Sequence, residues 1–220
     1  MKKLELEKIA KNLIETFIIS GDRAIELRNL GLITQIKPDN TPVTNGDLEV
    51  DKLIRKKILS ITPNIPIISE ETVNLKHKNT SKNFWLIDPI DGTSDYINNK
   101  NEFTLNAALI FNLEPVLGII YAPAKKRLFY SYGNGNAYEE YDGKKIILNC
   151  KKKNKSNIIV AVSNSSKPSE EILNIHKKFM VDKFINMRSS YKFCVIASGE
   201  YDLYVAKARA FEWDIAAGHA

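Results

Sequence analysis

Apolar residues recur three and four positions apart over residues 6–18, and this spacing predicts an amphipathic helix with one buried face. A second helix is predicted to begin near Asn45 or Asp47 and to end before Pro63. The stretch between the two helices, residues 37–42, holds two prolines and an asparagine, so it is predicted to be a loop. The chain therefore opens with two helices joined by an irregular segment.

Short apolar runs follow, and they predict strands. Residues 65–68 and 84–87 form brief, uninterrupted runs that are typical of buried strands. Three longer runs, separated by turn residues, cover residues 103–111, 116–121 and 127–132. Together these runs predict a sheet in the middle of the chain.

Strands and helices alternate toward the C-terminus. The predicted order is strand 158–162, helix 170–179, strand 184–187, helix 191–199 and strand 202–205. Such alternation is typical of an α/β unit. A run of lysines at residues 151–155 predicts a hinge in front of this unit. We therefore expect an N-terminal α+β lobe, residues 1–150, and a C-terminal α/β lobe, residues 151–220.

Composition narrows the class of protein. The 220 residues are 44% hydrophobic and 26% charged, as in ordinary globular proteins. A net charge of +6 suggests polyanionic ligands such as nucleotides, although a lysine-rich surface also serves solubility. The two cysteines form no CxxC pair, and no apolar run reaches the length of a membrane span. We expect a cytoplasmic monomer or homodimer, with peripheral contact at the inner membrane surface as an alternative. No nucleic-acid partner is expected, because the lysine run lacks interleaved aromatic residues.

Carboxylates follow directly after apolar runs in three segments. These are Ser69-Glu70-Glu71, residues 85–93 and residues 213–218. Carboxylates that converge at such points repel one another unless protons or cations neutralise them. Hard oxygen ligands in this number suit Mg²⁺, which commonly binds together with a phosphate. The three segments therefore predict a Mg²⁺-dependent phosphatase.

The central segment supplies most of this chemistry. Asp88 follows a predicted strand and Asp91 comes three residues later, so both carboxylates can face one pair of cations. Pro89 bars regular strand pairing, and the Ile90 carbonyl between the two acids can serve as a neutral ligand. Gly92 lets the backbone approach an anion closely.

A helix is predicted to begin directly after this glycine. Thr93 is expected to be its N-cap, with Asp95 in the first turn and free N–H groups aimed at a phosphate. Taken alone, residues 88–92 are more typical of a turn, and Glu70-Glu71 are more typical of a solvated pair. The joint occurrence of the three segments favours the metal site.

These segments, together with Pro42-Val43-Thr44 and Asp47, resemble in order the signature motifs of the inositol monophosphatase superfamily over essentially the whole chain. Residues 102–106, 117–123 and 190–194 are most similar to its bacterial 3'(2'),5'-bisphosphate nucleotidases of the CysQ type. The resemblance implies a layered αβαβα sandwich of the inositol monophosphatase and fructose-bisphosphatase type.

The resemblance also implies an activity: removal of the 3'-phosphate from adenosine 3',5'-bisphosphate to give AMP, and from 3'-phosphoadenosine 5'-phosphosulfate as a further substrate. Two alternatives stay open at this point. The first is an inositol monophosphatase or sugar-phosphate phosphatase of the same superfamily. The second is a truncated relic that is weakly active or inactive.

Site residues follow from the motifs and the resemblance together. The implied mechanism is in-line displacement by a water that two or three Mg²⁺ ions activate. The implied metal ligands are Glu70, Asp88, Ile90, Asp91 and Asp214. The implied catalytic residues are Asp47, Glu70 and Thr93. The implied substrate-binding residues are Asp91, Gly92, Thr93, Ser189, Ser190, Lys192 and Asp214.

Two positions depart from the nucleotidase pattern. Arg188-Ser189-Ser190 stands where those enzymes usually carry Gly-Ser-Ser, and Ser94 stands where they carry a basic residue. Arg188 is either an additional phosphate contact or a solvent-facing side chain. Lys192 is the predicted point charge for the second phosphate of the nucleotide.

The C-terminal segment carries a separate expectation. After Asp214 the sequence continues through Ala220 only, and so short a helix is marginal without packing partners. We expect Ile215, Ala216 and Ala217 to lack part of the apolar surface against which they would pack. We also expect a neighbouring strand edge to be unpaired and Asp214 to be held loosely. The alternative is that the sequence is a fragment of a longer protein.

Overall fold

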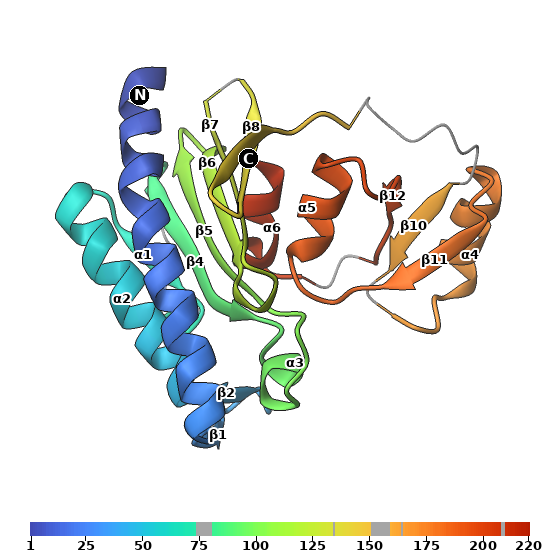
Figure 1. Cartoon of the computed structure of the whole chain (residues 1–220), viewed down its shortest axis with the longest axis horizontal. Helices are drawn as coiled ribbons and strands as arrows, with labels where there is room; N and C mark the ends of the chain where they lie inside the picture. Colours follow the sequence, from blue (N-terminus) through green and yellow to red (C-terminus); the bar gives the residue numbers. More distant parts are fainter. Residues whose placement is uncertain (74–80, 134, 151–158, 164, 208–209) are drawn as a thin grey trace.

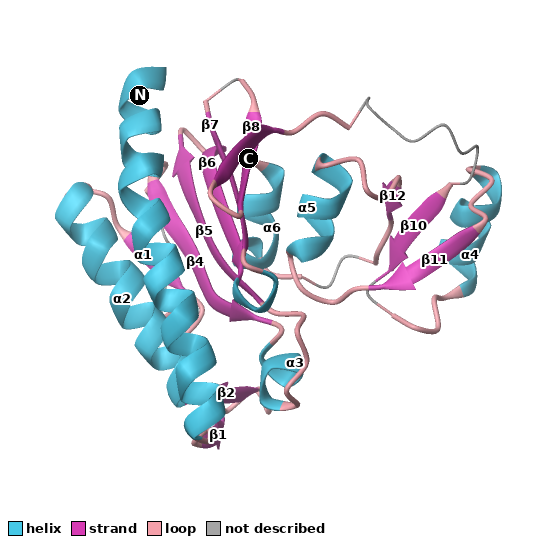
Figure 2. Cartoon of the chain, in the orientation of Figure 1, coloured by secondary structure: helices cyan, strands magenta, loops and turns pink. Residues whose placement is uncertain are grey.

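Layers of helix and sheet alternate in the computed structural model of this chain (Figure 1, Figure 2), which describes residues 1–73, 81–133, 135–150, 159–163, 165–207 and 210–220. The helices are α1 Lys3–Leu30, α2 Asn45–Ile61, α3 Thr93–Ile97, the 3-10 turn η1 Pro123–Lys125, α4 Glu170–Lys178, α5 Tyr191–Ala197 and α6 Glu212–His219. The strands are β1 Thr34–Ile36, β2 Pro42–Thr44, β3 Ile67–Ser69, β4 Phe84–Asp91, β5 Thr104–Phe111, β6 Glu114–Ala122, β7 Arg127–Tyr132, β8 Ala137–Tyr141, β9 Lys144–Ile147, β10 Val160–Ser163, β11 Lys183–Asn186 and β12 Leu203–Tyr204.

The large sheet has seven strands in the order β3-β4-β5-β6-β7-β8-β9. Strand β3 runs parallel to β4, and each later strand is antiparallel to the one before it. The small sheet has the order β11-β10-β12 and is parallel. Strands β1 and β2 form a separate antiparallel pair at the end of α1.

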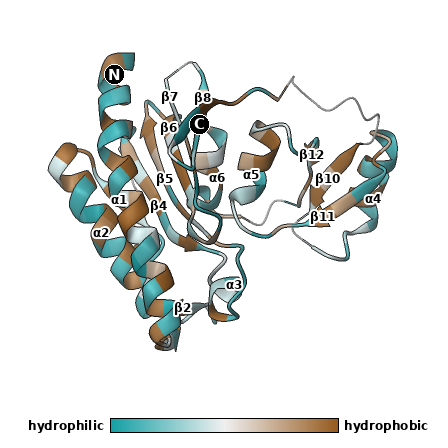
Figure 3. Cartoon of the chain, in the orientation of Figure 1, coloured by the Kyte–Doolittle hydropathy of each residue, from teal (hydrophilic) through white to brown (hydrophobic). Residues whose placement is uncertain are grey.

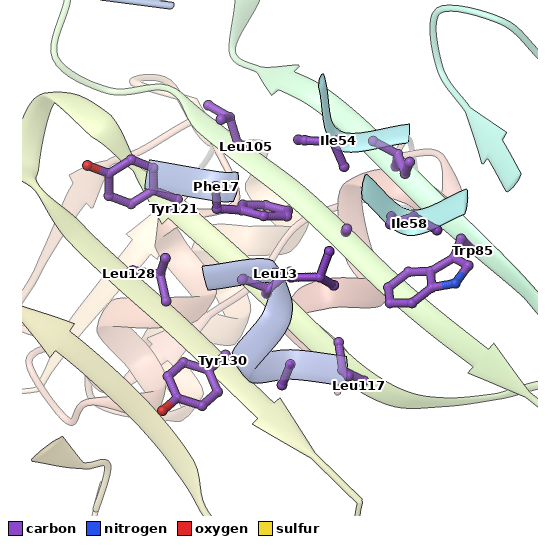
Figure 4. Packing of buried hydrophobic residues seen from close by; sticks show 14 of the residues in the cluster. Leu13, Phe17, Ile54, Ile58, Trp85, Leu105, Leu117, Tyr121, Leu128 and Tyr130 are labelled. Carbon is purple, nitrogen blue, oxygen red and sulfur yellow. The ribbon is translucent and has the colours of Figure 1, made fainter. Parts of the chain in front are cut away.

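One face of the large sheet is covered by α1 and α2. Leu13 and Phe17 of α1 and Ile58 of α2 are fully buried against Trp85 and Leu117 of the sheet (Figure 4). Apolar and polar residues alternate around both helices in Figure 3, as the periodicity predicted. Burial of apolar surface, at about 25 cal/mol per Å², is what fixes both helices to the sheet.

The opposite face of the large sheet is covered by α5 and α6. Cys194 of α5 and Ala217 of α6 are buried together with Ile120 and Phe129 of the sheet. Val162 of β10 belongs to the same core, so α5 and α6 lie between the two sheets (Figure 1). With α4 beyond the small sheet, the predicted αβαβα sandwich is confirmed.

Helices α5 and α6 share a core with the large sheet. The predicted division at residue 150 stays a prediction. The hinge predicted at residues 151–155 lies outside the described residues. All predicted helices and strands are present, most with ends shifted by a few residues, but α1 continues to Leu30, well past the predicted residues 6–18. Strands β1, β2, β8 and β9 were not predicted. None of the described helices combines the length and hydrophobicity that crossing a bilayer requires.

Helix α6 is packed more tightly than the sequence suggested. Ala216 and Ala217 are each only 8% exposed, so the expectation that both would lack part of their packing surface is wrong. Ile215, in contrast, is 41% exposed. A Cβ atom at Gly118 of β6 would lie 2.3 Å from the carbonyl oxygen of Ala217. The missing side chain at Gly118 therefore sets how closely α6, which carries Asp214, approaches the sheet.

Gly118→Ala is expected to destabilise the protein by about 1–3 kcal/mol, because the new methyl group meets backbone rather than a flexible side chain. Urea unfolding measures this change. Gly135→Ala is the matched control, since its new Cβ would meet only the side chain of Lys3. Equal midpoints for the two variants would show that α6 is free to move away from β6.

Candidate active site

The end of strand β4 is irregular, and this irregularity shapes the site. Asp88 pairs with Asn106 and Asp91 pairs with Thr104, but the register shifts between the two pairs. Pro89, which has no N–H to donate, lies within the shift. The strand predicted to end before Asp88 therefore continues to Asp91 after a bulge, which is a common way to re-aim side chains near a site.

Gly92, rather than Thr93, is the N-cap of α3, so the predicted capping role of Thr93 is wrong. Gly92 has a φ of 95°, which glycine adopts without strain, and a Cβ there would lie 3.0 Å from the carbonyl oxygen of Glu102. The Thr93 hydroxyl is thereby free for other partners. Its Oγ1 lies 3.1 Å from Oδ1 of Asp47 and 3.0 Å from the carbonyl oxygen of Ile90.

Asp47 is held in place by the start of α2. Its Oδ2 accepts hydrogen bonds from the N–H of Thr44 at 2.8 Å and from the Thr44 hydroxyl at 2.5 Å. The Thr44 hydroxyl in turn accepts from the first-turn N–H groups, which completes a capping box. Burial raises the pKa of Asp47, and these hydrogen bonds oppose the rise. Asp47 and Thr93 thus form a fixed carboxyl–hydroxyl pair.

Glu70 and Glu71 follow β3, and both contact Lys37, which lies in the segment predicted to be a loop. Nζ of Lys37 lies 2.9 Å from Oε1 of Glu70 and 2.8 Å from Oε1 of Glu71. Burial raises the pKa of Glu71 to about 7, although Lys37 opposes the rise. Lys37 was missed because an isolated lysine among turn residues gives no sign of its partner 33 positions away.

Asp91 and the α6 helix meet through Ser190. Both the N–H and the hydroxyl of Ser190 lie 2.5 Å from Oδ2 of Asp91. The same hydroxyl lies 2.8 Å from the carbonyl oxygen of Asp214, and Nδ2 of Asn106 donates to it at 3.2 Å. Oδ2 of Asp214 accepts from the N–H of Phe211 at 2.9 Å. Asp214 is therefore anchored, contrary to the expectation that it is loosely held.

Glu70, Asp88, Asp91 and Asp214 form what we call the carboxylate cluster, and it carries unbalanced negative charge. Burial first, and then the charges of Asp91, Glu70 and Asp214, raise the pKa of Asp88 well above its ordinary value. Burial and the charge of Asp91 raise the pKa of Asp214 to about 6. Oδ1 of Asp88 is buried without a hydrogen-bond partner in the described part of the chain. Such a cluster favours a bound cation.

The residues present fit a hard divalent cation. All four carboxylates line one cleft of about 340 Å³, together with Ile90, Gly92 and Thr93. Across the described ranges, no three acidic, histidine or cysteine side chains already stand close enough to hold a metal ion. Lys37 holds Glu70 and Ser190 holds Asp91, so these side chains would turn toward a cation when it binds. Oδ1 of Asp88 has no hydrogen-bond partner in the described part of the chain, so it would give up no contact when a cation binds.

A second cleft of about 610 Å³ shares Asp91 and Asp214 with the first and is lined by Arg188, Lys192 and Tyr204. Nζ of Lys192 donates to the carbonyl oxygens of Arg188 and Ser189, at 3.0 Å in each case.

Neither predicted substrate serine lines these two clefts. Ser189 is fully buried, and its hydroxyl accepts a 3.4 Å hydrogen bond from the N–H of Tyr191. The substrate roles of Ser189 and Ser190 stay predictions.

Residues 5–220 match the inositol monophosphatase family. This chain belongs to that family. It is 37% identical to the 3'(2'),5'-bisphosphate nucleotidase CysQ of Buchnera aphidicola over 84% of this chain and 69% of that protein. It is 32% identical to the enzyme of the same name from Aggregatibacter actinomycetemcomitans over 95% of this chain and 79% of that protein.

Solved structures agree with the family assignment. CysQ from Bacteroides thetaiotaomicron superposes with a TM-score of 0.72 at 26% identity, covering 96% of this chain and 83% of that one. An IMPase/NADP phosphatase in complex with Mg²⁺ and phosphate superposes with a TM-score of 0.78 at 20% identity, covering 96% and 79%. The second likeness shows the shared fold.

Asp214→Asn is expected to stabilise the metal-free protein in a pH-dependent way. Because the folded-state pKa of Asp214 lies above its unfolded value, the folded state holds the proton more tightly, and stability falls as pH rises from about 4 to about 6. The variant avoids this loss. Calorimetry in EDTA should show a midpoint higher by about 2 °C or more near pH 8, and no gain near pH 4. A gain that is equal at both pH values would contradict the charge account.

Proposed function

We propose that this chain is a Mg²⁺-dependent phosphatase that removes the 3'-phosphate of adenosine 3',5'-bisphosphate and leaves AMP; 3'-phosphoadenosine 5'-phosphosulfate is a further substrate. The observation that carries the proposal is the junction of two clefts at Asp91 and Asp214. One cleft holds the carboxylate cluster, and the other is lined by basic and aromatic side chains. A phosphate at the first and a nucleoside in the second match the activity named for the CysQ relatives.

The metal ligands we propose are Glu70, Asp88, the Ile90 carbonyl, Asp91 and Asp214, which would hold two or three ions. Bound Mg²⁺ neutralises phosphate oxygens and makes a bound water more acidic. For Glu70 to bind a cation, Lys37 must release one of its two carboxylates, and Glu71 remains its partner at 2.8 Å. The lysine therefore need not leave the site.

Thr93 and Asp47 would prepare the attacking water. Oγ1 of Thr93 has one proton, and Oδ1 of Asp47 at 3.1 Å is placed to accept it. A lone pair of Oγ1 then faces the cleft and accepts a hydrogen bond from water. Since burial raises the pKa of Asp47, its carboxylate is a better base than an exposed aspartate. The pair orients the water for in-line attack and draws off its proton.

Gly92 and the neighbouring backbone would lie against the transferred phosphate. Because Gly92 has no side chain, it leaves room for the phosphate in this cleft, which Thr93 and Ser94 also line. The departing ribose oxygen would leave toward Asp214 and the second cleft. A cytoplasmic location, a monomer or homodimer, and contact with the inner membrane surface through the charge of +6 complete the proposal.

Phosphate release tests the substrate. With Mg²⁺, adenosine 3',5'-bisphosphate should be hydrolysed with a higher kcat/KM than inositol 1-phosphate or fructose 1,6-bisphosphate, because the second cleft has apolar walls for a base. EDTA should abolish the release. Preference for inositol 1-phosphate would instead assign the chain to the inositol phosphatase alternative, and no release from any of the three would favour an inactive relic.

Asp91→Asn should keep the fold but lower kcat/KM at least about 100-fold, since even the outer partners of metal ligands are typically worth 10- to 100-fold. The amide oxygen can still accept from Ser190, but it brings no charge to the cluster. Circular dichroism checks the fold, and Mg²⁺ titration checks metal binding. Asp22→Asn, an exposed change on α1, is the control. Near-normal turnover by Asp91→Asn would refute the ligand assignment.

A further inference from the structure

The backbone of Arg188 is fixed from two sides. Its N–H donates to Oε1 of Glu102 at 2.8 Å, and its carbonyl oxygen accepts from Nζ of Lys192 at 3.0 Å. Glu102 comes from the segment before β5 and Lys192 from α5, so two separate elements define this position. The point from which the Arg188 side chain leaves the backbone is therefore well defined.

The Arg188 side chain itself is unpaired. Arg188 is exposed, and its one hydrogen bond to a described residue as donor comes from its backbone N–H rather than from its guanidinium. The other two cations that line the second cleft are already engaged. Lys192 is 6% exposed and spends two of its three donors on backbone carbonyls. Lys207 lies 2.5 Å from Oε2 of Glu171. Among the described residues that line this cleft, Arg188 is thus the cation whose side chain has no hydrogen-bond or ion-pair partner.

The second cleft has the size and lining that a nucleoside needs. Its volume of about 610 Å³ lies within the usual range for small-molecule sites. Asp91 and Asp214 join it to the carboxylate cluster, and Phe193 and Tyr204 provide aromatic surface. A ligand with one phosphate at the cluster and a base along these rings would occupy the cleft that Arg188 also lines.

We propose that Arg188 binds the phosphate that the enzyme does not hydrolyse, and that this contact selects nucleoside bisphosphates over monophosphates. The inference rests on the proposed function, and it moves the predicted role of Lys192 to Arg188. Lys192 is instead a positioning residue that holds the carbonyl groups of Arg188 and Ser189. A guanidinium suits the task because its planar fork binds two phosphate oxygens at once.

The pinned backbone makes this contact effective. A side chain that starts from a fixed point loses less freedom on binding than one on a loose loop. Glu102 bonds the N–H of Arg188 rather than its guanidinium, so it does not compete with phosphate for the fork. The acidic groups on the cleft are Asp91 and Asp214, which bound cations neutralise. Repulsion of a second phosphate is therefore small when metal is present.

Kinetics with two substrates tests the proposal. Arg188→Ala should lower kcat/KM for adenosine 3',5'-bisphosphate about 10- to 100-fold, mainly through KM, because a charge-assisted contact is lost. For adenosine 3'-monophosphate, which lacks the second phosphate, the change should stay within about twofold. Arg188→Lys should recover part of the loss, since it restores the charge without the fork. Equal losses on both substrates, or no recovery by lysine, would overturn the proposal.

Controls separate this contact from other effects. Arg23→Ala removes a half-buried arginine of α1 that pairs with Glu26 and lines none of these clefts, so it should leave both substrates unchanged. Lys192→Met should lower kcat/KM for both substrates alike, because it loosens the backbone of Arg188 and Ser189 beside the cleft that both substrates would occupy. Arg188 also borders a smaller cleft that is lined by Lys125. A selective loss on the bisphosphate from Lys125→Ala with none from Arg188→Ala would place the second phosphate there and overturn the assignment.

Binding measurements distinguish failure of this inference from failure of the proposed function. Calorimetry with Mg²⁺ present, where neither ligand carries a 3'-phosphate to be hydrolysed, should show that AMP binds the wild type more tightly than adenosine does, and that Arg188→Ala removes this difference. Absence of bisphosphate hydrolysis by the wild type would refute the proposed function without changing this result. Equal affinity of the wild type for AMP and adenosine would overturn the role of Arg188 whatever the catalytic outcome.

Discussion

The structure is organised around one electrostatic constraint: Asp88 is buried among other carboxylates, and one of its oxygens lacks a partner in the described part of the chain. A buried, unpaired charge is costly unless it is protonated or paired. Lys37 balances Glu70, and Ser190 satisfies one oxygen of Asp91, but neither reaches Asp88. The metal-free fold therefore holds an excess of negative charge that a divalent cation would neutralise. Repulsion among these carboxylates lowers the stability of the metal-free protein.

The two hydrophobic cores hold these charges in place. Strand β4, which carries Asp88 and Asp91, lies in the large sheet, between the helix pair α1 and α2 and the pair α5 and α6. Helix α2 brings Asp47 to the strand from one side, and α6 brings Asp214 from the other. Close contact at Gly118 fixes α6 against the sheet. Apolar burial on both faces thus opposes the repulsion within the cluster.

Local signals in the sequence predicted the fold well and the site in part. Hydrophobic periodicity predicted α1 and α2. Asp88, Ile90 and Asp91 are near neighbours in the sequence, so the sequence alone predicted that they lie close together. Strands β8 and β9 were missed because the adjacent charged pairs Glu139-Glu140 and Lys144-Lys145 interrupt residues 137–147, which show neither regular alternation nor a continuous apolar run. Lys37 and the Ser190–Asp91 bond were missed because they join residues that are distant along the chain. Thr93 was misjudged because Gly92 reaches a left-handed conformation and caps α3 itself.

The residues proposed for the chemistry and for substrate choice lie within a few positions of each other in the chain. Ser190 holds Asp91 of the cluster, whereas the side chain of Arg188, two positions earlier, donates to no described residue. Because Glu102 and Lys192 fix the Arg188 backbone independently of its side chain, residue 188 can change without moving Ser190 or Asp91. A position with that freedom can alter which phosphate esters bind while the carboxylate cluster stays intact. The departure from glycine at this position is therefore where a family with a common metal site would gain a substrate preference of its own.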